Sequence, residues 1–189
     1  SVRTADRARA TAAPPGAEDS PAAPAAPPED RHRVDEALAE LARRRLVEPA
    51  QPSGAGDPSA YRFSSGLVHE VAYSSLSKRA KAERHAWAAE LPSVARTGDG
   101  AVGGHLERAY RYRAELGLLD DRARELRDRA AAALARAGAQ AAARSDLHWA
   151  HGLLERAVEL RPDAARAVLG LGEVRVALGR TEEGAELLR

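Results

Sequence analysis

The sequence predicts a mainly α-helical fold, and three observations support that prediction. Apolar residues recur at helical spacing through most of the chain after residue 33. Alanine and leucine dominate the apolar set while aromatic residues make up only 4% of the chain, and such side chains suit closely packed helices. Residues 120–189 contain two segments that align with each other at an offset of about 34 residues.

The composition excludes several classes of protein. The 29 basic and 28 acidic side chains leave a formal charge of +1, too weak a field to hold nucleic acid or an anionic membrane by itself. There is no cysteine, which rules out disulfides and thiolate metal sites and is typical of a cytoplasmic protein. No stretch approaches the roughly 18 consecutive apolar residues of a membrane helix, so we expect no membrane partner.

Residues 1–31 are rich in alanine and proline and offer almost nothing for a core, so we expect a disordered linker there. The chain opens at Ser1 and stops at Arg189 within an amphipathic pattern. Both observations lead us to expect a piece of a longer protein.

Residues 32–95 are expected to form a degenerate winged helix followed by two junction helices. Val34, Leu38 and Leu41 share one side of a helix, and an extended stretch follows at Leu46. A loop rich in proline and glycine then precedes a short alternating strand at residues 60–63. This order of helix, strand, loop and strand is the back half of a winged helix.

Two further helices and a loop are expected next. One helix begins near Ser65, and another begins after Ser77 with Trp87, Leu91 and Val94 as its apolar stripe. Residues 96–119 are expected to form a loop, over the glycine-rich segment 98–104, and a connecting helix that ends before Gly117.

The two aligned segments in residues 120–189 resemble tetratricopeptide repeats. With Ala131 in first position, the residues at the repeat's small, large and terminating positions are Gly138, Ala150, Leu154, Ala157 and Pro162. A second repeat from Ala165 places matching residues at Leu171, Gly172, Gly179 and Leu188. The resemblance implies stacked helical hairpins that bind other proteins. Because about three hairpins are normally required, we expect the array to continue past the chain's end or to be capped by the preceding helices.

A wider resemblance covers roughly residues 33–189. The stretch from Tyr61 to Leu76, followed by a basic helix with His85, is similar to a junction in bacterial STAND-type regulatory ATPases, which include cyclase-linked ATPases and large LuxR-type regulators. In that family the segment joins a winged helix to tetratricopeptide repeats. Ser64 and Ser65 stand where an Arg-His pair is common. The resemblance implies that ATP and Mg²⁺ bind in an upstream domain, while the repeats bind a partner and the winged helix relays the state.

No residue is assigned a catalytic, cofactor-binding or metal-binding role. The segment 98–104 lacks the lysine of a phosphate loop, and no serine lies in a nucleophile turn. His148 and His151 share a helical face but have no third ligand nearby, while His69 and His105 are each paired only with a neighbouring glutamate. We interpret these histidines as surface or packing residues.

Two further features have a structural and a functional interpretation. The basic clusters at Arg43–Arg45 and Lys78–Lys81 could contact DNA phosphates, but the balanced charge favours solvated helix faces. Trp149 either packs against the neighbouring hairpin, which we favour, or is an exposed anchor for a peptide.

The sequence therefore predicts a non-catalytic regulatory segment of a larger, actinobacterial-type ATP-binding regulator of signalling or transcription. Its partners would be a protein or peptide bound by the repeats and, within the same chain, a nucleotide-binding domain. Two alternatives remain at this point: a free-standing tetratricopeptide adaptor and a DNA-binding winged-helix regulator.

Overall fold

The computed structural model describes residues 28–49 and 61–189. The chain divides into two compact units, Ser1–Val68 and His69–Arg189, which are described separately. Most of the predicted linker, residues 1–27, and the predicted loop at residues 50–60 lie outside the described residues. The described chain is mainly helical, as predicted.

The first unit contains a helix and a two-stranded antiparallel sheet. Helix α1 spans Pro28–Arg43, strand β1 spans Val47–Pro49 and strand β2 spans Tyr61–Phe63. The helix begins earlier than the predicted boundary at residue 32, because proline suits the first helical turn, where its missing N–H is no loss. Val47 is paired with Phe63 and is buried, while all three residues of β2 stay exposed.

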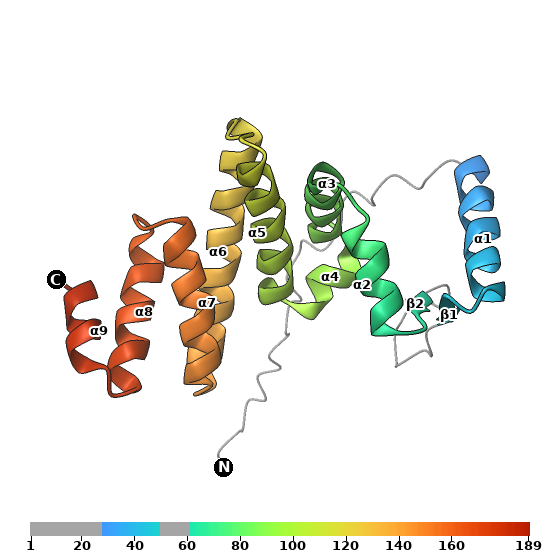
Figure 1. Ribbon diagram of the computed structural model, residues 1–189. Coiled ribbons are helices and arrows are strands. Elements are labelled where there is room, and N and C mark those ends of the chain that lie inside the picture. Colours follow the sequence, from blue (N-terminus) through green and yellow to red (C-terminus); the bar gives the residue numbers. More distant parts are fainter. Residues whose placement is uncertain (1–27, 50–60) are drawn as a thin grey trace, which may run out of the picture. The chain divides into compact units, whose positions relative to one another are not determined.

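Eight helices make up the rest of the described chain (Figure 1). Ser77, Asp120 and Asp146 cap three of them by accepting a hydrogen bond from the backbone N–H three residues on. The helices are α2 (Gly66–Ser74), α3 (Lys78–Ala89), α4 (Pro92–Thr97), α5 (Asp99–Glu115), α6 (Asp121–Ala143), α7 (Leu147–Leu160), α8 (Ala165–Ala177) and α9 (Thr181–Leu187). The passage from the first unit to the second falls within α2.

The prediction of a loop at residues 98–104 is wrong, because α5 begins at Asp99. Gly98, with φ of 116°, ends α4 and precedes the first residue of α5. Gly103 lies inside α5 where this helix meets α6, and a Cβ there would come within 2.8 Å of the Cγ atom of Leu134. The glycine therefore permits a close approach of two helices, which the sequence pattern alone did not distinguish from a flexible loop.

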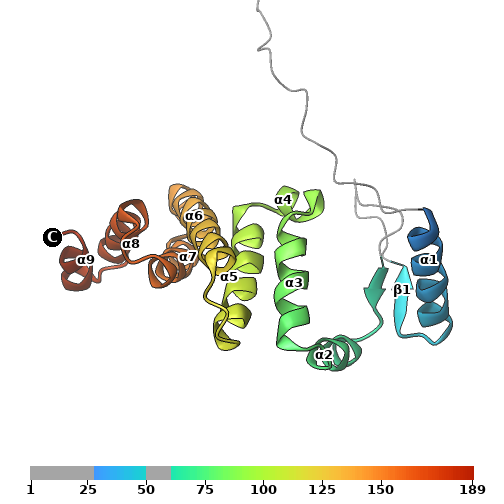
Figure 2. The same cartoon turned by 90° about the horizontal axis from the view of Figure 1, so that it is seen from above.

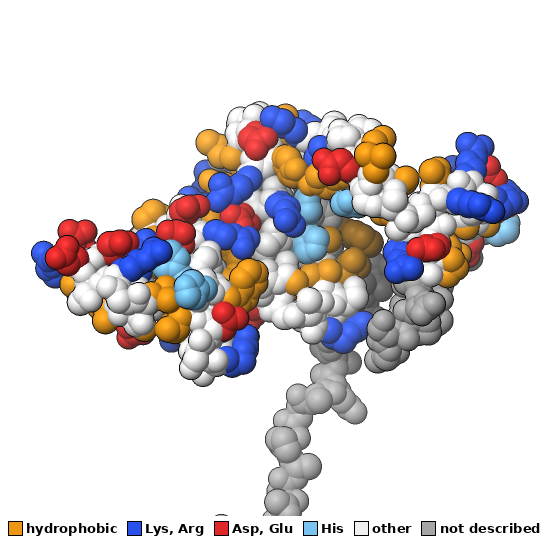
Figure 3. Space-filling view, turned by 60° about the horizontal axis from the view of Figure 1, so that its bottom comes forward, with side chains coloured by type: hydrophobic (Ala, Val, Ile, Leu, Met, Phe, Trp, Pro, Cys, Tyr) orange, Lys and Arg blue, Asp and Glu red, His pale blue; other side chains and the backbone are white. Residues whose placement is uncertain are grey.

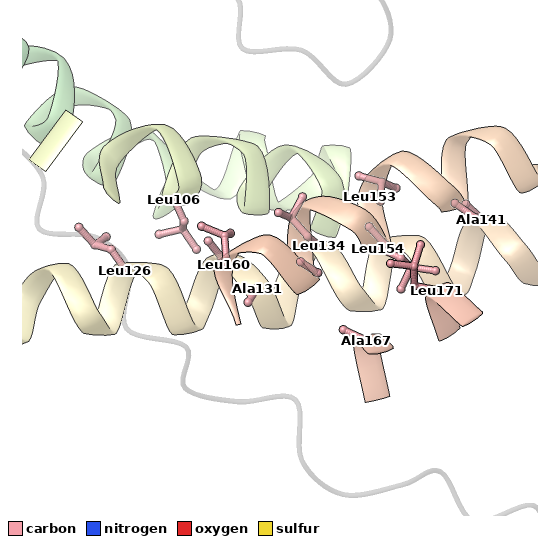
Figure 4. Close-up of a cluster of buried hydrophobic side chains, with 14 of the residues drawn as sticks. Leu106, Leu126, Ala131, Leu134, Ala141, Leu153, Leu154, Leu160, Ala167 and Leu171 are labelled. Atoms are coloured by element: carbon pink, nitrogen blue, oxygen red, sulfur yellow. The ribbon is translucent and has the colours of Figure 1, made fainter. Parts of the chain in front are cut away.

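From α5 to α9, helices that follow one another in the sequence lie side by side, as Figures 1 and 2 both show. Figure 4 shows the buried side chains between them, which are mostly leucine and alanine. Leu106, Leu126, Leu134, Leu153 and Leu154 are the largest fully buried residues. No helix within residues 28–49 and 61–189 combines the length and apolar character that crossing a membrane requires.

One close contact recurs in the last two helical pairs. In α6, a Cβ on Gly138 would lie 2.6 Å from the Cγ atom of Leu154 and 3.4 Å from the carbonyl oxygen of Ala150. In α8, a Cβ on Gly172 would lie 2.8 Å from the Cγ atom of Leu188 and 3.2 Å from the carbonyl oxygen of Gly184. The residues of the two contacts correspond one to one at the offset of 34 residues found in the sequence. In the pairs α6–α7 and α8–α9, the two helices therefore pack against each other through the same kind of contact.

Candidate functional site

Helices α3 and α6 border a first hollow in the second unit. It has a volume of about 390 Å³. Trp87 of α3 lines it and keeps 66% of its surface exposed, so this member of the predicted apolar stripe is not covered by packing. Leu126 of α6 also lines this hollow but is almost completely buried, and charged side chains make up much of the rest of the lining. The complete lining is Ala82, Glu83, Ala86, Trp87, Glu90, Arg113, Arg122 and Leu126.

Helices α6 and α8 border the second hollow, which has a volume of about 380 Å³. Small side chains form much of its lining: Ala131, Ala132, Ala135, Ala164, Ala165 and Ala167. Three arginines and one aspartate complete it, namely Arg136, Arg161, Arg166 and Asp128. Since alanine side chains barely project, a large apolar side chain from another molecule can reach the helix backbones here.

The two hollows flank one exposed face of α6. Helical residues are about 100° apart around the axis, so Glu125, Arg129, Ala132 and Arg136 share a face. All four have solvent-accessible side chains. Arg122 lies at one border of this face and lines the first hollow, whereas Asp128 lies at the other border and lines the second. We call this face, with its two hollows, the α3–α6–α8 face.

Ion pairs fix several charged groups on this face. Arg129 of α6 reaches Glu90 at the end of α3, with 2.6 Å between Nη2 and Oε1. Arg136 holds Asp99 of α5 with two hydrogen bonds, of 3.1 and 2.7 Å, and these bonds lower the pKa of the Asp99 carboxyl. Arg161 pairs with both Asp163 and Asp128.

Arg166 differs from the other arginines of the second hollow. It is exposed in the first turn of α8, and its guanidinium has no hydrogen bond or ion pair to any residue that the structure describes. Its five N–H donors therefore face solvent at the edge of the alanine-lined surface.

Charge is distributed unevenly between the helices of the second unit. Helices α3, α6 and α8, which border the hollows, together carry eleven Lys and Arg residues against five Asp and Glu residues. Helices α5, α7 and α9 together carry four against eight. On the face turned to the viewer in Figure 3, acidic side chains gather at the α9 end. Although the formal charge of the whole chain is only +1, the helices that border the hollows carry an excess of basic side chains.

A second notable group of side chains joins α2, α3 and α5. The hydroxyl of Tyr73 lies 2.9 Å from Nε2 of His85 and 2.9 Å from the hydroxyl of Tyr112. On the other side of the ring, Nδ1 of His85 lies 2.9 Å from Nδ1 of His105. The ammonium of Lys81 is 4.7 Å from the centre of the Tyr73 ring. We call Tyr73, His85, His105 and Tyr112 the His–Tyr chain.

The His–Tyr chain favours neutral side chains. Burial, the neighbouring His105 and the charge of Arg108 lower the pKa of His85 to about 4. Burial and Arg108 also lower the pKa of His105. Burial and the hydrogen bond with Tyr112 raise the pKa of Tyr73 to about 12. A neutral His85 can accept a hydrogen bond from Tyr73 at Nε2 and donate one to His105 from Nδ1.

This group is important for α2 because the helix has little other support. Every residue of α2 remains at least partly exposed, including Leu67 at 74% and Val71 at 60%. In the sequence, His85 belongs to a basic helix, and no pattern there connects it with Tyr73 or His105. Such pairings between helices follow from the packing of α3 on α5 and leave no spacing signal in the sequence.

Two of the other histidines singled out in the sequence, His148 and His151, belong to α7 and lie outside the His–Tyr chain. His148 is exposed, whereas His151 is partly buried and has Nε2 3.4 Å from Nε of Arg175. His69 stacks on Tyr73 with ring centres 5.9 Å apart. No group of three or more His, Cys, Asp or Glu residues within the described ranges is placed to hold a metal ion.

Trp149 and the basic clusters can also be placed. Trp149 is 56% exposed and lines a separate hollow with Asp99 and Arg144, so packing covers less than half of it, contrary to our expectation. In the first basic cluster, Arg43 and Arg44 both pair with Glu40. In the second, Lys78 pairs with Glu115.

Comparisons with known proteins give no relative from which a function can be transferred. No family model, no curated protein and no solved structure matches the chain.

Proposed function

We propose that the second unit is a protein-interaction module of tetratricopeptide type, which binds a segment of a partner protein on the α3–α6–α8 face. The observation that carries the proposal is the recurring contact of Gly138 with Leu154 and of Gly172 with Leu188. Hairpins closed in this way can stack in one direction, and a stacked array exposes the first helix of each pair along a continuous face.

The α3–α5 pair supports this proposal because it extends the array. Helix α5 packs against both α3 and α6, as α7 packs against both α6 and α8. The short helix α4 separates α3 from α5, which is why the sequence offset of 34 residues does not extend to this pair. With α3–α5 included, the array reaches the three pairs that a stable stack of hairpins usually needs.

The surface of the α3–α6–α8 face suits a peptide rather than a small molecule. Both hollows are open to solvent and lie along helices, and one is lined by an exposed tryptophan while the other is lined with alanine. Exposed aromatic residues beside small side chains are common anchors in protein interfaces. The face also lacks the closely grouped acid, base and nucleophile that a catalytic site would require within the described residues.

We further propose that the chain has a regulatory role as part of a longer protein, and this proposal rests on the resemblance to STAND-type ATPases. In that role α2 is the element through which the first unit and the repeats are connected, and the His–Tyr chain fastens it to α3 and α5. Partner binding on α3 and α6 would then act on α3, one of the two helices that hold α2.

Selection of random peptides displayed on phage against the full chain tests the proposed function. Ala132 is exposed and lines the second hollow, so Ala132→Tyr should fill the hollow without disturbing the core. The matched control is Ala185→Tyr, at an exposed alanine of α9 that lines neither hollow. We expect peptides that lose affinity about tenfold with Ala132→Tyr and keep it with Ala185→Tyr. Peptides that bind both variants equally would refute this location.

A further inference from the structure

We infer that the partner segment bound on the α3–α6–α8 face is acidic, with leucine-sized apolar side chains between its carboxylates. This inference rests on the proposed function and concerns the chemistry of the segment. The charge at the second hollow, the hydrogen-bond donors that remain unused there and the shape of the alanine surface all support it.

The second hollow carries one cation that has no ion pair among the described residues. Arg136, Arg161 and Arg166 line it with Asp128, but Arg136 pairs with Asp99 and Arg161 pairs with Asp163 and Asp128, so the positive charge left over is that of Arg166. The same sign holds for the whole of α3, α6 and α8, which carry an excess of six basic side chains, whereas α5, α7 and α9 carry an excess of four acidic ones. A segment approaching this face therefore meets a field that attracts carboxylates and repels ammonium groups.

The unused donors identify where a carboxylate would bind. Arg161 already uses Nε, Nη1 and Nη2 on Asp163 and Asp128. Arg136 uses Nε and Nη2 on Asp99 and keeps Nη1. Arg166 keeps its whole guanidinium, which can bind a carboxylate through two parallel N–H donors. Arg166 is therefore the principal contact, and Arg136 is a second one across the hollow.

The alanine surface sets the apolar part of the segment. Ala132 and Ala165 are exposed and Ala135 and Ala164 are partly exposed, on facing helices of the second hollow. An apolar side chain placed against them buries surface on both molecules, which contributes about 25 cal/mol for each Å² removed from water. Acidic residues on either side of that side chain would reach the arginines at the edge. A purely acidic segment lacks this contribution, and a basic one meets repulsion.

The test uses three fluorescein-labelled peptides of about twelve residues, in which two residue types alternate in pairs. One combines leucine with glutamate, one leucine with lysine and one serine with glutamate. Their affinity for the full chain is measured by fluorescence anisotropy at low salt and at roughly 1 M salt. We expect the leucine–glutamate peptide to bind most tightly, and to bind more weakly at high salt.

Charge reversal at Arg166 supplies the decisive comparison. Arg166→Glu should lower the affinity for the leucine–glutamate peptide about tenfold or more and raise the affinity for the leucine–lysine peptide. The variant should fold, because a carboxylate in the first turn of a helix is favourable. Arg180→Glu is the matched control: Arg180 is exposed at the start of α9, lines neither hollow and should leave both affinities unchanged.

The outcomes separate this inference from the proposed function. Equal affinities for the glutamate and lysine peptides, or no effect of Arg166→Glu, overturn the acidic preference. If the affinity for both peptides nevertheless falls with Ala132→Tyr, the result supports the proposed binding face while the inference fails. A serine–glutamate peptide that binds as tightly as the leucine–glutamate peptide also overturns the inference, because the hollow then plays no part. If no peptide binds, the inference fails. The phage selection then remains as the separate test of the proposed function.

Discussion

Gly138 of α6 lies directly against Leu154 of α7, and there is no room for a methyl group between them. Leu154 is fully buried and the backbone of Ala150 lies behind the same space, so neither neighbour can give way cheaply. Gly172 makes the same close contact with Leu188, although Leu188 is 44% exposed. The small residues of the repeat pattern thus act as spacers that set the distance between paired helices.

Gly138→Ala should destabilise the protein even though alanine is the better helix former. The gain in helix propensity is about 1 kcal/mol, while forcing a methyl group into this contact costs about 1 to 3 kcal/mol. The control is Gly152→Ala in α7, where a Cβ meets nothing within 4 Å. Urea unfolding should show a lower free energy of unfolding for Gly138→Ala and an unchanged or higher one for Gly152→Ala. A stabilised Gly138→Ala protein would contradict the close contact.

Glu107 is predicted to be the most sensitive charged residue of the second unit. Its side chain is 6% exposed and pairs with Arg156 and Arg111. Burial by itself would raise the pKa of this carboxyl, but the hydrogen bonds from Arg156 and Arg111 outweigh burial and leave the pKa below its usual value. Glu107→Gln should lower the free energy of unfolding by about 2 kcal/mol.

The control for Glu107 is another carboxylate bound by the same arginine. Glu159 pairs with Arg111 at 3.1 Å but is 58% exposed, so Glu159→Gln should change stability by less than about 1 kcal/mol. Equal effects of the two substitutions, measured by thermal unfolding, would show that burial of Glu107 has no energetic role.

The His–Tyr chain should make stability depend on pH. Because the folded protein keeps His85 neutral to about pH 4, the unfolded chain binds protons first as the pH falls below its ordinary histidine value near 6.5. Stability is therefore complete above about pH 6.5, declines between there and pH 4, and loses nothing further from this group below pH 4. We expect a loss of about 1 to 2 kcal/mol, since solvent screens a partly exposed ring.

Replacing the ring isolates this effect. His85→Gln should be less stable than the native protein at neutral pH, and its stability should fall less between pH 6.5 and 4. Urea unfolding at a series of pH values measures both quantities. Parallel curves for the two proteins would mean that His85 does not titrate differently on folding.

Tyr73→Phe should loosen α2 while leaving the repeats intact. The substitution removes the hydroxyl that joins His85 and Tyr112 but keeps the ring. Hydrogen exchange should become faster for the backbone amides of residues 69–74, because few other contacts hold α2, and should stay unchanged in α7. The matched control is Tyr61→Phe in β2, at an exposed ring of the first unit. Unchanged exchange in α2 would show that the His–Tyr chain does not fasten it.

Helices were predicted correctly from the sequence where the spacing of apolar residues was complete within one helix. The helical spacing of α1 and the turn signals after it predicted the order of helix, strand and strand, and the 34-residue offset marked Gly138 and Leu154. The prediction failed at Gly103, because a glycine needed for close helix packing has the same local appearance as one in a loop. Whether a residue such as Trp87 is covered depends on which helices pack around it, and that is a property of the fold.

The candidate site was less predictable for the same reason. The positive set of helices is invisible in a total charge of +1, because it appears only when α3, α6 and α8 are separated from α5, α7 and α9. Similarly, the pairing of Tyr73 with His85 and Tyr112 joins residues from three helices.

The location of the bound peptide on the protein is the most direct test of the central claim. Hydrogen exchange of the full chain, measured by mass spectrometry with and without a phage-selected peptide, reports which segments become protected. The peptide should increase protection in α3, in residues 122–136 of α6 and in residues 164–167, which border the two hollows. Protection confined to α7 and α9, or to the hollow around Trp149, would contradict the assignment of the α3–α6–α8 face.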